Sequence, residues 1–166
     1  MSTMSQRKEE YASLEDDLVE LLKHLLAELP PDVASLEVKR ATPSGEGMIA
    51  VLRPQNPAAA SVVAHTENGL GLVDLSFGEY GPTWELPIEG YNSKANKKEL
   101  LQEVEDMCRA VIAGNCQHKR GLFSIRGNIQ VNNHLYRVTD MFVFRPVPPL
   151  RGTRKYEPYV GGWPGL

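Results

Sequence analysis

The chain has 166 residues, and its 42% hydrophobic and 23% charged content are ordinary for a globular protein, which argues against wholesale disorder. A chain of this length favours one domain and buries roughly 70% of the surface that its unfolded form exposes, so neither a disulfide nor a metal is needed to hold the core. The N-terminal segment lacks the apolar stretch of a signal peptide, and no apolar run reaches the ~18 residues of a membrane helix. We therefore expect a cytoplasmic protein without membrane contact.

The net charge of −3 conceals an uneven distribution. Residues 1–113 carry 10 basic and 19 acidic side chains, whereas residues 114–166 carry 8 basic and 2 acidic side chains. Such asymmetry can steer a charged partner. Alternatively, the two segments neutralise each other in the folded protein, and the sequence does not decide between these two readings.

The first half of the chain predicts a helix followed by a strand meander. Leucines at three- and four-residue spacing indicate a helix within residues 9–29, which Pro30-Pro31 ends. Asn68-Gly69 is a strong hairpin-turn dipeptide between two apolar strands. The expected strands cover residues 36–40, 48–52, 61–65, 70–77 and 83–86.

The second half repeats this order. A helix is expected over about residues 97–113, with Asn96 as its N-cap, Glu99 in capping-box register and Gly114 as its terminator. Gly127-Asn128 and Asn132-Asn133 predict turns or bulges. The expected strands cover residues 122–126, 129–131, 135–138 and 141–144.

These elements predict the α+β class. We expect a mostly antiparallel sheet packed by two main helices, in the order helix–strands–helix–strands, because hairpins rather than helices connect the strands. Residues 1–150 should form a single domain. Residues 151–166, rich in Gly, Pro and aromatic side chains, predict a C-terminal tail that is an ordered coil or a flexible extension.

The sequence holds no recognisable catalytic or cofactor motif. Cys116 and His118 are close enough in sequence for a thiol–imidazole pair, but such a pair needs a third, orienting group. A structural zinc site needs four ligands, and no second ligand pair accompanies these two. We expect no cofactor and no metal. The alternative is an enzyme with an unrecognised site, which would draw on His65, His118, His134, Cys116 or Asp140.

A basic stretch with interleaved aromatic residues raises nucleic-acid binding as a further alternative. Basic side chains and stacking aromatics on a sheet are how single strands are held. Here the aromatics alternate as core residues would, and the sequence pI is about 5.8, so we expect nucleic acid not to be the partner. The residues concerned are Lys119, Arg120, Arg126, Arg137, Arg145, Arg151, Arg154 and Lys155, with Phe123, Tyr136, Phe142 and Phe144.

The segment 78–96 predicts a surface loop suited to a protein partner. Trp and Tyr are over-represented among interface hot spots, and glutamates between them would face a basic surface. The alternative is that Trp84 and Tyr80 cover one end of the core. The candidate partner-binding residues are Glu79, Tyr80, Trp84, Glu85, Glu89 and Tyr91.

Two stretches carry a resemblance to a known class. Val73-Asp-Leu-Ser-Phe-Gly-Glu-Tyr-Gly-Pro-Thr-Trp-Glu-Leu-Pro and Glu103-Val-Glu-Asp-Met-Cys-Arg-Ala-Val-Ile-Ala-Gly resemble the small α+β immunity proteins of bacterial polymorphic toxin systems. The resemblance implies a non-enzymatic cytoplasmic protein that binds and neutralises a cognate toxin. The chain is also similar to small acidic secretion chaperones, which implies binding of an effector segment.

Overall fold

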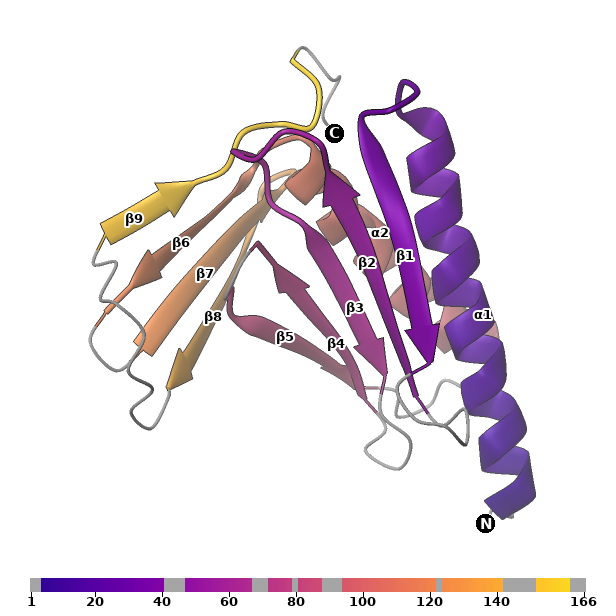
Figure 1. Cartoon of the computed structure of the whole chain (residues 1–166). Helices are drawn as coiled ribbons and strands as arrows, with labels where there is room; N and C mark the ends of the chain where they lie inside the picture. Colours follow the sequence, from indigo (N-terminus) through magenta and orange to yellow (C-terminus); the bar gives the residue numbers. More distant parts are fainter. Residues whose placement is uncertain are drawn as a thin grey trace.

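The computed structural model describes residues 4–40, 47–66, 72–78, 81–87, 94–121, 124–141 and 152–161. It confirms the α+β class and the order helix–strands–helix–strands (Figure 1). The elements are α1 (Met4–Glu28), β1 (Ala34–Arg40), β2 (Met48–Pro54), β3 (Val62–Thr66), β4 (Leu72–Phe77), β5 (Thr83–Pro87), α2 (Lys94–Ile112), β6 (Cys116–Arg120), β7 (Ser124–Val131), β8 (His134–Met141) and β9 (Gly152–Lys155).

The strands form two sheets rather than one. The first sheet is the expected antiparallel meander, in the order β1-β2-β3-β4-β5. The second sheet has the order β8-β7-β6-β9, and its pairs are also antiparallel. β5 and β8 approach one another where the two sheets meet. The expected hairpin turn at Asn68-Gly69 lies outside the described residues.

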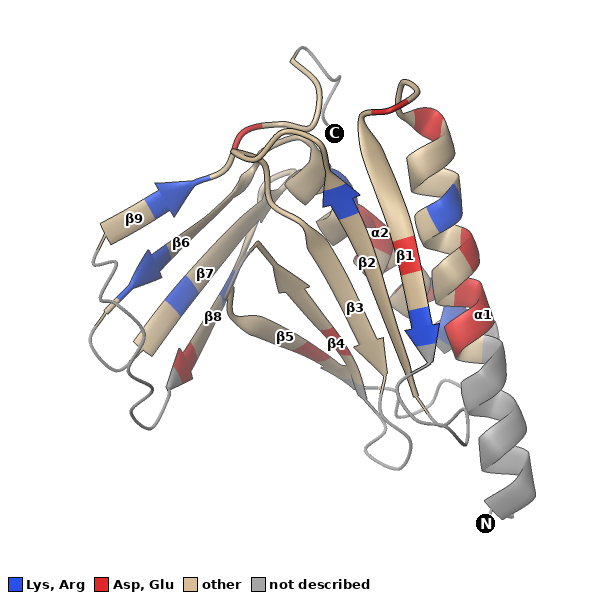
Figure 2. Ribbon diagram, in the orientation of Figure 1, with Lys and Arg blue, Asp and Glu red and all other residues tan. Residues whose placement is uncertain are grey.

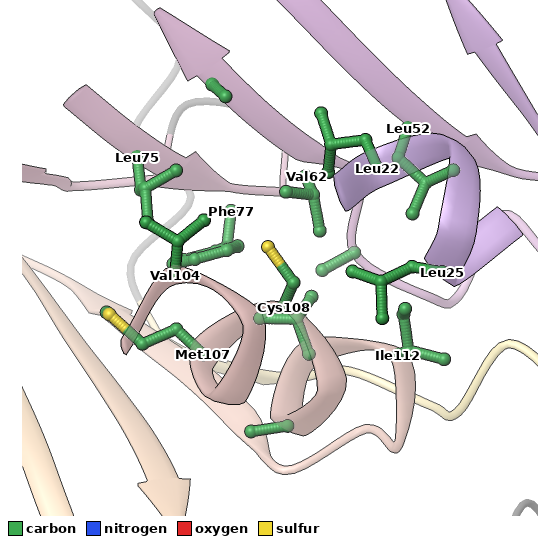
Figure 3. Close-up of a cluster of buried hydrophobic side chains, with 14 of the residues drawn as sticks. Leu22, Leu25, Leu52, Val62, Leu75, Phe77, Val104, Met107, Cys108 and Ile112 are labelled. Atoms are coloured by element: carbon green, nitrogen blue, oxygen red, sulfur yellow. The ribbon is translucent and has the colours of Figure 1, made fainter. Parts of the chain in front are cut away.

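Both helices bury an apolar stripe in one shared core (Figure 3). The buried apolar side chains of α1 are Leu14, Leu18, Leu22 and Leu25, and those of α2 are Leu100, Val104, Met107, Cys108, Ala110, Val111 and Ile112. Helix α2 contacts α1 and the strand β7, so it joins the first helix to the second sheet. Burying one such leucine stabilises the fold by about 1.5–3 kcal/mol. Because the buried side chains are those that repeat with the helical period, the apolar pattern predicted both helices.

The two ends of α2 differ in how well the sequence predicted them. The helix begins at Lys94, so Asn96 lies inside its first turn and the expected N-cap is wrong. Gly114 does end the helix, with φ of 77°. A Cβ atom at this glycine would lie 2.6 Å from the backbone nitrogen of Pro158, so the position needs glycine both for its conformation and for close packing.

Gly127-Asn128 lies within β7 and is neither a turn nor a bulge, so that expectation is wrong. The reason is contact between the sheets, because a Cβ atom at Gly127 would collide with Pro82 and with the ring of Trp84. Glycine here allows close approach rather than a bend. The Asn132-Asn133 turn is confirmed, with Asn132 at φ of 50°.

The C-terminal segment is not the expected coil. Residues 152–155 form β9, which pairs with β6, and Tyr156 and Tyr159 after it are buried. The Tyr159 hydroxyl donates to the carbonyl oxygens of Ala60 at 2.8 Å and Leu52 at 3.3 Å. A buried tyrosine whose hydroxyl finds an acceptor adds a large apolar area without a desolvated polar group, so this segment closes the core.

Candidate binding surface

The second sheet has two chemically different faces. Its inner face carries Cys116, Ile125, Ile129 and Val131, which are buried. Side chains alternate across a strand, so the intervening residues of β6 and β7 point away from the core. On the described part of β7 these alternate residues, such as Arg126 and Gln130, are exposed or half-buried. A polar outer face of four strands results.

The outer face carries hydrogen-bond donors in two rows that cross the sheet. The strand register places Lys155, Gln117, Asn128 and Arg137 in one row, and Thr153, Lys119, Arg126 and Thr139 in the next. We call this surface the basic face and include with these eight residues Ser124, Gln130 and Leu135 from the same side of β7 and β8. Figure 2 shows Lys and Arg on β6, β7 and β9, whereas α1 and α2 carry much of the acidic charge.

The acidic residues of the basic C-terminal third do not point toward this face. After residue 113 the sequence contains two acidic residues, Asp140 and Glu157. Asp140 pairs with Ile125 in the register of the inner face, and its carboxylate accepts a hydrogen bond from the backbone nitrogen of Thr83 at 2.8 Å. Glu157 follows β9 and accepts from the Asn56 side chain at 3.2 Å. The β strands themselves therefore offer no carboxylate to the cations of the basic face.

Lys119 and Arg126 face each other directly across β6 and β7. Two like charges at directly opposed positions destabilise a sheet. Neither side chain forms an ion pair with any residue that the structure describes. The pair therefore does not stabilise the unbound protein, whereas an anion bound between the two side chains would offset their repulsion.

The six candidate partner-binding residues divide into three groups. Glu79, Tyr80, Glu89 and Tyr91 lie outside the described residues. Glu85 is exposed on β5. Trp84 is only 8% exposed and packs against Phe77, with ring centroids 5.2 Å apart. The side chain of Trp84 therefore packs in the core, which agrees with the alternative that it covers part of the core.

The Cys116 and His118 side chains are not arranged as an activated pair. Burial raises the pKa of the Cys116 thiol to about 12, which is the reverse of what a nucleophilic thiolate needs. His118 instead lies beside Tyr156, whose hydroxyl oxygen is 2.9 Å from Nδ1. Burial lowers the pKa of His118, and the positive charges of Arg154 and Arg120 lower it further.

The other candidates for an enzyme site lie in different places. His65 contacts Asp74 at 3.5 Å on the first sheet, His134 is exposed at the start of β8, and Asp140 bonds to β5. Within the described ranges, no three His, Cys, Asp or Glu side chains come together as a metal site would require. These residues therefore belong to separate local contacts rather than to one shared pocket.

Sequence reasoning grouped the cations of the basic face but missed its neutral donors. Gln117, Asn128 and Gln130 were not predicted as site residues, because side-chain amides are common on any protein surface. The signal was present as alternation, since Ser124-Ile-Arg-Gly-Asn-Ile-Gln-Val places a polar side chain at every second position. The pairing of β7 with β6 and β8 then shows that these polar side chains lie on one face of the sheet.

Comparisons with known proteins add no relative. No family model matches the chain, and no curated protein and no solved structure matches it significantly. In the part of the chain that the structure describes, neither helix combines the length and the apolar character needed to cross a membrane. The function of the basic face therefore has to be inferred from the chemistry of its side chains.

Proposed function

We propose that this chain is a non-catalytic protein-binding module whose partner presents carboxylates to the basic face. The carrying observation is a four-stranded sheet face that displays two rows of donors and no carboxylate from its own strands. Charge-assisted bonds from Lys and Arg to carboxylates are the strong class of hydrogen bond. Their arrangement on a rigid sheet favours a partner of matching shape and charge.

The resemblance to immunity proteins supplies the biological form of this proposal. In that form the chain is a bacterial cytoplasmic inhibitor that neutralises a cognate toxin by covering an acidic part of its surface. The aromatic–acidic segment 78–96 suggested a basic partner surface, whereas the basic face calls for an acidic one. A toxin that carries both kinds of patch would satisfy both segments.

A protein suits this face better than a nucleic acid. Single-stranded nucleic acids are held by bases stacked on aromatic rings, and Tyr136, the aromatic residue of β8, points to the inner side, in register with Ile129. Leu135, in contrast, is 43% exposed among the polar groups of the basic face. Such an apolar side chain can add contact area with a protein partner, and Arg is enriched at protein interfaces.

Co-expression tests the proposal. The candidate toxin is the C-terminal domain of the protein that the reading frame immediately upstream of this chain encodes. This domain would be expressed alone, with the wild-type chain, or with a Lys119→Glu/Arg126→Glu variant. We expect growth arrest, rescue and loss of rescue, respectively. A Lys39→Glu/Arg53→Glu variant is the matched control, because it changes the net charge equally on exposed positions of the first sheet, and it should rescue growth as the wild type does.

Two results would overturn the proposal. One is an upstream product that does not arrest growth, and the other is full rescue by Lys119→Glu/Arg126→Glu. A mobility-shift assay with single-stranded RNA and duplex DNA covers the competing class of ligand. Salt-dependent binding that Lys119→Glu/Arg126→Glu abolishes would assign the basic face to nucleic acid instead.

A further inference from the structure

One end of the basic face is hollowed. The hollow has a volume of about 290 Å³, and its polar lining includes Asn115, Gln117, Asn128, Gln130 and Lys155, with Leu135 as an apolar wall. Small-molecule pockets usually enclose about 300–1,000 Å³. This hollow lies just below that range, so its size suits a single side chain of a partner.

Three donors of the hollow come from three neighbouring strands. Lys155 on β9 is opposite Gln117 on β6, and Gln117 is opposite Asn128 on β7. Directly opposed residues have Cα atoms about 4.5–5.5 Å apart, so one group placed above Gln117 is within reach of all three side chains. The register therefore produces a converging set of donors.

These donors have no partner within the described part of the fold. The side chains of Gln117, Asn128 and Lys155 make no hydrogen bond or ion pair with a described residue. Gln130 differs, because its amide nitrogen donates to the carbonyl oxygen of Asn132 at 2.7 Å, which fixes this side chain as a wall. A carboxylate has two oxygens with about four acceptor sites, enough for one ammonium and two amide donors.

We propose that this hollow is the anchor subsite of the basic face and takes one glutamate side chain of the protein partner. Lys155, Gln117 and Asn128 donate to its carboxylate, and Leu135 contacts its methylene groups. This inference rests on the proposed function and sharpens it. The partner residue held here is acidic and projects from the partner surface, whereas Lys119 and Arg126 contribute a broader attraction.

A direct test uses two small probes that differ only in charge. N-acetyl-glutamate methylamide and N-acetyl-glutamine methylamide would be titrated separately into the full-length ¹⁵N-labelled chain, and the side-chain NH₂ resonances of Gln117 and Asn128 would be followed. We expect a saturable shift with the glutamate probe and a response at least 10-fold weaker with the glutamine probe, because bonds to a charged acceptor are about twice as strong. Equal responses would overturn the inference.

Variants connect the hollow to partner binding. Gln117→Glu and Asn128→Asp keep the shape of each side chain but place a second carboxylate in the hollow. Each should weaken binding of the toxin domain roughly 10- to 100-fold, the loss expected for a hydrogen bond to a charged group. Lys155→Met is a second route that adds no negative charge, and it should reduce binding within the same range.

Gln55→Glu is the control, because Gln55 is exposed after β2 and does not line the hollow, and the substitution changes the net charge by the same amount as Gln117→Glu. The outcomes separate the two proposals. If Lys119→Glu/Arg126→Glu abolishes rescue while all three hollow variants rescue as the wild type does, the anchor is wrong and the proposed function stands. If neither set of variants affects rescue, both proposals fail.

Discussion

Replacing Lys119 by glutamine should make the protein more stable while it weakens partner binding. Lys119 is exposed and directly opposite Arg126, and neither side chain pairs with a described carboxylate. Glutamine keeps much of the side-chain length and removes one of the two opposed charges. The free energy of unfolding should therefore rise while binding weakens, which is the trade-off between stability and function that is common at functional sites.

The size of the gain follows from the distance between the charges. Two unit charges about 6 Å apart in bulk water repel by about 0.7 kcal/mol, which falls within the roughly 0.2–1 kcal/mol range of cross-strand pairs. The Debye length is about 10 Å at 0.1 M salt and about 3 Å at 1 M. The gain should consequently be clear at low salt and nearly vanish at 1 M salt.

Urea denaturation at 0.05 M and 1 M sodium chloride measures this gain. Lys39→Gln is the control, because Lys39 forms an ion pair with Glu37 at 2.8 Å, and its loss should leave the unfolding free energy unchanged or slightly lower. If Lys119→Gln lowers the stability, or raises it equally at both salt concentrations, then Lys119 and Arg126 do not repel one another. The physical basis of the proposed function would then be lost.

Three further predictions concern the core. Thr66→Val should lower the free energy of unfolding by roughly 2–4 kcal/mol. The reason is that the Thr66 hydroxyl donates to the buried Glu15 carboxylate at 2.9 Å and accepts from the backbone nitrogen of Met48 at 3.0 Å. Urea denaturation measures this loss, and an unchanged midpoint would contradict the prediction. Gly127→Ala should cost about 1–3 kcal/mol, measured by thermal unfolding with Gly161→Ala as the control, because the new methyl group would collide with Trp84. The Cys108 thiol, with its pKa raised to about 12 by burial, should resist a thiol reagent at pH 8 until urea unfolds the chain, and prompt labelling of the native protein would show that it is accessible.

The sequence predicted the elements whose apolar pattern is local. The leucines of α1 and the stripe of α2 repeat with the helical period, and β3 alternates buried and half-buried residues along its length. In each case burial against the core requires the same residues that produce the pattern. These elements could therefore be predicted without knowledge of their neighbours.

β9 could not be predicted in this way. Its four residues, Gly152–Lys155, are all exposed, so they carry no apolar alternation. The strand exists because the free edge of β6 supplies backbone hydrogen-bond partners and because Tyr156 and Tyr159 are held in the core. Both causes depend on contacts between residues distant in sequence, which a single sequence does not reveal.

The candidate surface depends on strand register in the same way. Lys119 and Arg120 are adjacent in sequence, but only Lys119 points to the basic face, since Arg120 is in register with Ile125 on the inner face. Counting cations between residues 119 and 155 therefore mixed two groups with different roles. Sorting them requires the pairing of β6 with β7 and β9.

The placement of the helices explains how the fold can carry such a surface. Both helices pack into the common core, and α2 contacts the second sheet through β7, so the inner face of this sheet is covered while its outer face is free to carry function. Substitutions on the outer face change charge without changing the packing of Ile125 or Ile129 behind it. The acidic excess of residues 1–113 and the basic face of the second sheet also give the molecule a charge separation. This separation can orient an approaching partner before contact. The net charge of −3 is therefore a poor guide to what this protein binds, because the sign of the charge at the interface depends on which face of the strands meets the partner.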